Sequence, residues 1–226
     1  MIEKIKNYSS NICANKKKRC ILIISLIVLI ILLIIIIAIA VGVSKKKYSN
    51  EVCKKPYDIK VYSDSKLKSA IKKCGYKEDS DLFDFVLNVT KRHNDYRACH
   101  NAEPLLPNCE LMEISQSYAE TMPSDHSGSE FHGEWMGENL YWIWNGYPTG
   151  YDPVDAWYSE ISDYDFNTHS SIGGKKVGHF TQLVWKNSKE IGVGYYCNNN
   201  QCCVVSNYYP GGNYNNDNVN QVQALK

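Results

Sequence analysis

The side chains of this chain that could bind a metal or move a proton are scattered along the sequence rather than grouped. It has six histidines, and no two have the His-Glu-x-x-His spacing that places two imidazoles on one face of a helix. Imidazole nitrogens and carboxylate oxygens are ligands that Zn²⁺ accepts. Any such site must be assembled by the fold from distant residues, and the spacing alone favours a structural role for a single dispersed histidine.

Nucleophilic serine chemistry is not indicated by the sequence. Two serines have a neighbour that could act as a base: Ser127 follows His126, and Ser159 precedes Glu160. Neither stands in the Gly-x-Ser-x-Gly elbow that exposes a nucleophile at a strand-to-helix turn. We therefore expect Ser127 to be a turn residue and Ser159 to be a hydroxyl on a helix surface.

The net charge and the cysteine content of the chain indicate which partners and which cellular compartment to expect. The 226 residues carry a formal net charge of +1, which argues against nucleic acid or another polyanion as a partner. There are nine cysteines without a C-x-x-C pair. Disulfides formed in an oxidising compartment explain so many cysteines better than a zinc knuckle does.

An apolar segment near the N-terminus predicts the route to that compartment. Residues 21–43 are almost entirely apolar, and at a rise of ~1.5 Å per residue a helix of this length spans about 35 Å, enough for a ~30 Å hydrocarbon core. The basic residues 16–19 favour a cytoplasmic segment 1–20 and a type II signal anchor. The alternative is a signal peptide cleaved near 38–40, a small-x-small site, with the protein then secreted.

The remaining chain divides into a linker, a folded domain and a tail. Residues 44–80 show no sustained period and predict a stalk, residues 81–220 predict the domain, and residues 221–226 predict a C-terminal tail. Apolar residues at three- and four-residue steps predict one helix over about 81–98 and a second over about 111–122. Asp152 before Pro153 predicts another helix start, with the carboxylate capping free N–H groups.

The C-terminal third predicts strands. Residues 180–184 suit a short helix, whereas 191–197 and 202–209 are β-rich runs separated by a turn at 198–201. Helices and an antiparallel sheet in one domain define an α+β fold.

Four segments together resemble one known family. They are His-Asn-Asp-Tyr-Arg at 93–97, Gly-Glu-Asn-Leu at 137–140, Gly-His-Phe-Thr-Gln-Leu-Val-Trp at 178–185 and Asn-Tyr-Tyr-Pro-Gly-Gly-Asn at 207–213. Their order and spacing are similar to those of the CAP superfamily (SCP domain), the cysteine-rich secretory, venom-allergen-like and pathogenesis-related proteins. The resemblance covers about residues 81–220.

The resemblance implies an α-β-α sandwich, preceded here by the transmembrane or signal helix, with a central cavity. It places two histidines and two glutamates in that cavity, at His126, Glu138, Glu160 and His179, as ligands for Zn²⁺ or another divalent metal. His132 is an alternative to His126. His93 keeps a structural role, because it falls on the apolar stripe of the first helix.

Two classes of function follow from this resemblance. A non-enzymatic binding module, extracellular and secreted or tethered to the membrane, is preferred, because the family has no generally accepted enzymatic activity. The alternative is a metal-dependent, peptidase-like hydrolase, in which a metal on His126 and His179 acidifies a water and Glu138 or Glu160 is the general base.

A small apolar ligand is the other candidate partner of the binding module. Some members of the family bind sterols or lipids, and the loop before the Gly-His-Phe block is the one implicated. Here that loop contains Tyr164 and Phe166, which could bind a sterol or fatty acid, because burial contributes roughly 25 cal/mol per Å² of apolar surface. Core filling is an equally good interpretation of both rings.

Proximity suggests two disulfides. Cys197 could close the hairpin with Cys202 or Cys203, and Cys99 could pair with Cys109. The sequence departs from the family at Ser206, where the family usually has cysteine. Because seven cysteines follow residue 50, one is left free or pairs between chains.

Overall fold

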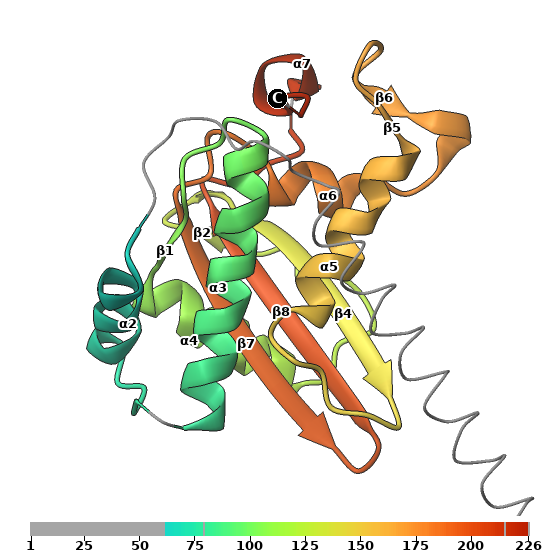
Figure 1. Cartoon of the computed structure of the whole chain (residues 1–226). Coiled ribbons are helices and arrows are strands. Elements are labelled where there is room, and N and C mark those ends of the chain that lie inside the picture. The colour runs from blue at the N-terminus through green and yellow to red at the C-terminus, as the bar shows by residue number, and fades with distance from the viewer. Residues whose placement is uncertain (1–61, 79, 215, 226) are drawn as a thin grey trace, which may run out of the picture. The chain divides into compact units, whose positions relative to one another are not determined.

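A four-stranded sheet organises the described part of the chain (Figure 1). The computed structural model describes residues 62–78, 80–214 and 216–225, all within the unit Lys55–Lys226. The strand order is β1-β7-β8-β4, with β1 parallel to β7 and the other pairs antiparallel. The strands are β1 (Leu106–Pro107), β4 (Gly137–Trp144), β7 (Glu190–Asn198) and β8 (Gln201–Tyr209).

Helices cover both faces of this sheet. Phe85 of α3 stacks on Tyr195 of β7, with ring centroids 4.3 Å apart, while α4 packs against the opposite face (Figure 1). The domain is therefore an α+β fold with the helix–sheet–helix layering expected from the sequence. The helices are α2 (Asp64–Lys73), α3 (Asp81–Cys99), α4 (Cys109–Glu120), α5 (Asp152–Ser159), α6 (Gly178–Leu183) and α7 (Asn218–Gln221), with 3-10 turns η1 (Glu160–Asp163) and η2 (Ile172–Gly174). Two small ribbons complete the fold, β2 (Glu130–Phe131) with β3 (Glu134–Trp135) and β5 (Tyr164–Asp165) with β6 (Ser170–Ser171).

Glycines in β7 allow α4 to lie directly on the sheet. A Cβ atom at Gly192 would come within 2.2 Å of the Leu111 carbonyl oxygen, and one at Gly194 within 2.1 Å of the Ser115 carbonyl oxygen. Only glycine permits such an approach of backbone to backbone. This contact fixes α4, and with it the loop that follows α4, against the centre of the sheet.

The buried face of α3 is tied to the rest of the domain by Arg97. Its side chain is fully buried, and its guanidinium donates hydrogen bonds of 2.8–2.9 Å to backbone carbonyls. Those carbonyls belong to Glu103, Leu183, Trp185 and Ser188. One side chain thus satisfies buried backbone acceptors from two separate loops.

Part of the expected stalk is folded. Residues 64–73 form α2, which is capped by Ser63 and buries Leu67 and Ile71. The sequence showed no long period because α2 contributes only these two buried residues. The folded domain therefore begins well before residue 81, which corrects the boundary drawn from the sequence.

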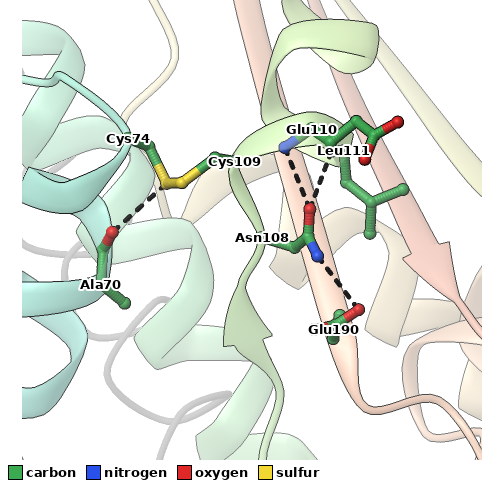
Figure 2. The surroundings of a disulfide bond; sticks show 7 residues. All are labelled: Ala70, Cys74, Asn108, Cys109, Glu110, Leu111 and Glu190. Carbon is green, nitrogen blue, oxygen red and sulfur yellow. Dashed lines mark hydrogen bonds between the residues drawn. A yellow bond between two sulfur atoms is a disulfide. The ribbon is translucent and has the colours of Figure 1, made fainter.

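Docking of α2 also determines a disulfide. Cys74, just after the helix, is bonded to Cys109 at the start of α4 (Figure 2). Asn108 caps α4 beside this bond, its Oδ1 accepting from the backbone N–H groups of Glu110 and Leu111. The predicted Cys99–Cys109 bond is wrong, because the folded α2 brings Cys74 to Cys109.

The hairpin predicted from the C-terminal third is confirmed. Strands β7 and β8 pair in a register that places Cys197 opposite Cys202, and these two cysteines form a disulfide. Among the described cysteines, Cys203 is free and buried, and burial raises the pKa of its thiol to about 12. Within the described residues Cys203 is therefore the unpaired cysteine, and its buried, protonated thiol is a poor nucleophile.

Two local expectations differ from the structure. Helix α5 begins at Asp152 as expected, but the N-cap position is Tyr151, and the Asp152 carboxylate accepts hydrogen bonds from the backbone N–H and the hydroxyl of Thr149. The expected C-terminal tail is docked, since Val222 is buried and the Gln223 carbonyl accepts a hydrogen bond from His100 Nδ1.

The predicted membrane segment 21–43 and the predicted cytoplasmic segment 1–20 lie outside the described residues. Within residues 62–78, 80–214 and 216–225, no helix combines the length and the apolar character needed to cross a membrane.

Candidate functional site

The fold brings the four predicted site residues together as two His–Glu pairs. His126 follows α4 in a loop, and Glu138 is the second residue of β4. Glu160 opens η1 at the end of α5, and His179 is the second residue of α6. The rings of His126 and His179 approach to a centroid distance of 6.4 Å at an interplanar angle of 41°.

The carboxylate of Glu138 orients the imidazole of His126 by a hydrogen bond. Its Oε1 atom lies 2.9 Å from His126 Nδ1 and accepts a second hydrogen bond from the backbone of Ser127. Its Oε2 atom accepts from Asn207 Nδ2 on β8, and Asn207 Oδ1 lies 2.7 Å from the buried hydroxyl of Ser115 on α4. The sheet and α4 therefore orient this carboxylate.

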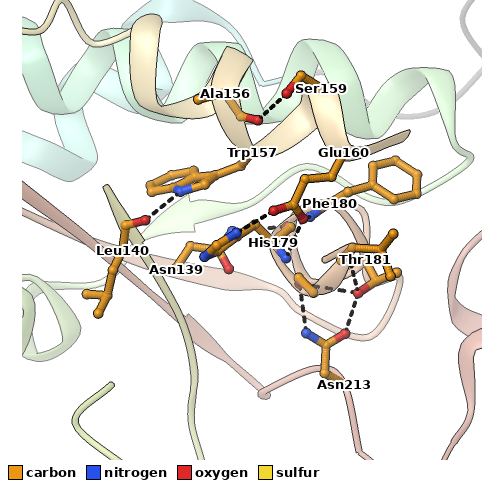
Figure 3. Close-up of polar contacts among 12 residues, drawn as sticks. Asn139, Leu140, Ala156, Trp157, Ser159, Glu160, His179, Phe180, Thr181 and Asn213 are labelled. Atoms are coloured by element: carbon orange, nitrogen blue, oxygen red, sulfur yellow. Dashed lines mark hydrogen bonds and ion pairs between the residues drawn. The ribbon is translucent and has the colours of Figure 1, made fainter. Parts of the chain in front are cut away.

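Glu160 holds His179 in the same way (Figure 3). Its Oε1 atom lies 2.6 Å from His179 Nδ1, and its Oε2 atom accepts from the backbone N–H groups of His179 and Phe180. The ring of Trp157 lies nearly parallel to the imidazole, with centroids 6.4 Å apart. Asn139 Nδ2 donates to the backbone carbonyl of His179, so β4 positions both pairs.

The contacts assign the protonation of each imidazole. In both pairs Nδ1 faces a carboxylate, which accepts a hydrogen bond, so Nδ1 carries the proton and Nε2 of a neutral ring carries the lone pair. The side chains of Glu138 and Glu160 are only 6% and 17% exposed, against 50% for His126 and 28% for His179. The imidazoles face solvent and the carboxylates lie behind them.

This geometry differs from a four-ligand metal site. Within the described residues, no group of three or more His, Cys, Asp or Glu side chains is arranged to hold a metal ion. The donors that remain open toward a metal are the two Nε2 atoms of His126 and His179. Glu138 and Glu160 each accept a hydrogen bond from the other ring nitrogen of a histidine, as carboxylates commonly do when they orient a zinc ligand.

In the His126–Glu138 pair, both pKa values are shifted from their ordinary values. The hydrogen bond to Glu138 raises the pKa of His126 above its ordinary 6.5, against the effect of burial. Burial alone would raise the pKa of Glu138, but hydrogen bonds from His126, Ser127 and Asn207 together hold the pKa of this carboxyl below its usual value. The His126–Glu138 pair is therefore stabilised in its charged form.

We expect His126 in the metal-free protein to titrate above pH 6.5. Because folding raises the pKa of this histidine, its contribution to stability is complete below pH 6.5 and is lost as the pH rises through the folded-state value. Glu138→Gln should move the pKa of His126 back toward 6.5. An NMR titration of the ring protons measures both values, and an unchanged His126 pKa in Glu138→Gln would contradict the assigned pairing.

The other candidate side chains have structural roles, as their positions in the sequence suggested. His93 is fully buried, donates from Nδ1 to the Val89 carbonyl and accepts at Nε2 from the Tyr208 hydroxyl, and burial lowers its pKa to about 3. His132 contacts Glu110 on the surface, so it does not replace His126. The Ser127 hydroxyl accepts from the backbone N–H of Ser129 in a tight local turn, and the Ser159 hydroxyl donates to the carbonyl of Ala156 on α5.

The two predicted lipid-contacting rings occupy different environments. Tyr164 is 4% exposed and packs edge-to-face on Phe166 at 4.9 Å. Phe166 is partly exposed and also packs against His100 and Phe180. The placement of Tyr164 favours core filling for that ring.

Sequence reasoning missed the residues that support the two pairs. Asn139, Asn207 and Ser115 are buried polar side chains on β4, β8 and α4. Two of them stand inside the recognised segments 137–140 and 207–213. Polar residues within otherwise apolar strands were the available signal, because a buried amide requires partners.

A groove of about 410 Å³ adjoins the loop of His126. It lies along the outer side of α4, beside Ile114 and Tyr118, and ends at Ser127 and Ser129. The Tyr118 hydroxyl donates to the backbone carbonyl of Asp125, which fixes the loop between the groove and His126.

Comparisons with known proteins agree with this fold. The family described as the cysteine-rich secretory protein family, CAP, matches residues 90–208. Golgi-associated plant pathogenesis-related protein 1 of Homo sapiens is 39% identical over 138 residues, 59% of this chain and 87% of that protein. Pathogenesis-related leaf protein 4 of Solanum lycopersicum is 39% identical over 127 residues, 54% of this chain and 75% of that protein. The crystal structure of hookworm platelet inhibitor superposes with a TM-score of 0.50 at 18% identity, over 66% of this chain and 80% of that one, and shares the fold alone.

Proposed function

The chain belongs to the cysteine-rich secretory protein family, CAP, and we propose that its described domain is a non-enzymatic binding module for one divalent metal ion of the Zn²⁺ class. The ion is held by Nε2 of His126 and Nε2 of His179. Bound there, it supplies open coordination positions for the donor atoms of a partner or of solvent.

The orientation of the two imidazoles carries this proposal. Each Nδ1 is committed to a buried carboxylate, so each neutral ring presents its Nε2 lone pair on the side away from that carboxylate. Such carboxylate–histidine pairs raise the basicity of a metal ligand and fix its ring. The two rings come from the loop after α4 and from helix α6, and their centroids lie 6.4 Å apart. We infer that one ion can contact both.

The carboxylates support binding over hydrolysis. A general base needs a free oxygen and a pKa near the working pH. Both oxygens of Glu138 and both oxygens of Glu160 already accept hydrogen bonds, and the pKa of Glu138 is lowered. We therefore rank the metal-dependent hydrolase below the binding module.

A sterol or fatty acid is the second candidate ligand. The observation that favours it is the partly exposed ring of Phe166 in an aromatic cluster with Phe180. Contact with an apolar ligand at this ring would bury surface that now faces water.

We place the domain outside the cytoplasm. The disulfides Cys74–Cys109 and Cys197–Cys202 persist in oxidising compartments. Tethering through residues 21–43 as a type II membrane protein, or release after cleavage of that segment, are the two proposed modes of export.

Native mass spectrometry of the full chain, purified from the cells that produce it, tests the metal proposal. We expect a mass increase of one zinc-class ion per chain that disappears after chelation. A bound lipid with no metal, even after addition of Zn²⁺, would instead support the second candidate and overturn the first.

The role of the carboxylates gives a separate prediction. Glu160→Gln should weaken Zn²⁺ binding by roughly 10- to 100-fold, because the negative charge and one of the two acceptor oxygens that orient His179 are lost while both Nε2 ligands remain. Isothermal titration with Zn²⁺ measures the change. Glu134→Gln is the matched control, since Glu134 is an exposed glutamate bonded to Tyr209. Equal Zn²⁺ affinity in Glu160→Gln and in the unaltered chain would show that this carboxylate does not support the site.

A further inference from the structure

A second groove lies at the opposite end of β4 from Glu138. It has a volume of about 340 Å³ and is formed by the loop after β4 and the turn between β7 and β8. Its described lining residues are Asn145, Gly146, Tyr147, Asn199, Asn200 and Cys202. The volume falls within the range of about 300–1,000 Å³ that is usual for small-molecule sites.

The walls of this groove are held in place by the backbone. Asn145 N–H donates to the Asn200 carbonyl at 2.7 Å, which joins the two loops. The Cys197–Cys202 disulfide closes the base of the turn. The backbone of this groove is therefore fixed before a ligand enters, which lowers the entropic cost of binding.

The chemistry of the lining is polar and uncharged. Within the described residues, the side-chain amides of Asn145, Asn199 and Asn200 make no hydrogen bond to the protein. Asn145 and Asn199 adopt positive φ angles of 55° and 43°, and Asn199 and Asn200 form the turn between β7 and β8, so turn geometry suits all three residue types and leaves their side-chain amides open to solvent. Each amide offers two donors and one acceptor oxygen, and none of the lining residues carries a charge.

Exposed aromatic rings flank these amides. Tyr147 is 76% exposed in the groove wall, and Trp144, at the end of β4, is 63% exposed. Exposed rings of this size contribute nothing to the core. A ligand that suits this wall is a ring with apolar C–H faces, which can stack on the aromatic side chain. Hydroxyl groups at the edge of the same ring can form hydrogen bonds with the amides.

We propose that this groove binds a neutral sugar ring of a glycan, stacked on Tyr147 and hydrogen-bonded through the amides of Asn199 and Asn200. The absence of charge among the described lining residues disfavours nucleic acid and acidic peptides, which need cationic partners. The amides disfavour a lipid chain, since it could not satisfy them. The groove is separate from His126 and His179, so sugar binding does not depend on the metal.

Saturation-transfer NMR on the full chain, prepared without sugar-headed detergent, tests this proposal with three probes: maltotriose, mannotriose and tri-N-acetylchitotriose. We expect saturation transfer to at least one of them. Tyr147→Ala should weaken that binding at least about tenfold, equivalent to about 1.4 kcal/mol, and Asn200→Ala should also weaken it. Tyr214→Ala is the control, since Tyr214 is a partly exposed tyrosine that packs on Trp185.

Two further conditions separate this site from the metal site. Chelation of divalent metals should leave sugar binding unchanged, and raising the salt concentration should have little effect because no charge is involved. Failure of all three probes to receive saturation, or equal affinity in Tyr147→Ala and the unaltered chain, would overturn the proposal whatever the outcome of metal titrations.

Discussion

Replacing Arg97 by leucine is expected to lower the free energy of unfolding by at least about 3 kcal/mol. The guanidinium is fully buried and donates to four backbone carbonyls from two loops. Leucine removes every one of these donors and leaves the carbonyls buried without partners. Burial lowers the pKa of Arg97 to about 9, but the side chain stays charged at neutral pH.

Urea unfolding followed by circular dichroism measures this effect in the oxidised protein. Lys91→Leu is the matched control on the same helix, because Lys91 pairs with Asp64 at the surface and such pairs contribute about 1 kcal/mol or less. Arg97→Lys should be intermediate, since one ammonium cannot reach four carbonyls. If Arg97→Leu unfolds at the same urea concentration as the unaltered chain, the structural role assigned to Arg97 is wrong.

Loss of one metal ligand gives the other large effect. His179→Ala should weaken Zn²⁺ binding by more than about 100-fold, beyond the 10- to 100-fold typical of orienting residues. His179 supplies one of two protein nitrogens, so its removal halves the protein's share of the coordination. The same loss is expected for His126→Ala, measured by isothermal titration at neutral pH.

The folding of these variants should be preserved. The side chains of His126 and His179 are partly exposed, in contrast to the fully buried His93. His132→Ala is the control for a surface histidine, since His132 pairs with Glu110 at the surface, and this variant should bind Zn²⁺ normally. A folded His179→Ala protein with undiminished affinity would place the metal elsewhere.

Elements with strong local signals could be predicted from the sequence. The apolar stripe of 81–98 corresponds to α3, and the β-rich runs around 198–201 correspond to the hairpin of β7 and β8. The recognised segments then indicated which distant histidines and glutamates the fold would bring together. Each of these inferences rests on a period or a motif within a short stretch of chain.

Elements that depend on tertiary contacts were missed. Helix α2 has only two buried residues, and its partner surface on α3 and β1 is invisible in its own sequence. No strand was predicted over residues 137–144, although β4 pairs with β8 over its whole length. Once β4 is a strand, Glu138 faces Asn207 across the sheet and becomes an orienting group instead of a free ligand.

The segment 93–97 shows that a family motif can serve packing rather than ligand binding. His93 and Arg97 are both buried and hydrogen-bonded within the domain, so their residue types serve packing. The apolar stripe of the first helix already predicted a structural role for His93, whereas the carbonyl partners of Arg97 lie outside its own segment. Burial and the identity of the hydrogen-bond partners decide between the two roles.

A long-range ¹H–¹⁵N NMR spectrum of the histidine side chains, recorded before and after addition of Zn²⁺, tests the central claim most directly. Without metal, we expect the neutral rings of His126 and His179 to carry the proton at Nδ1, because each Nδ1 faces a carboxylate. One equivalent of Zn²⁺ should shift the Nε2 resonances of both rings and leave His93 and His132 unchanged. Unshifted Nε2 resonances of His126 and His179 at saturating Zn²⁺, or neutral rings protonated at Nε2, would contradict the account.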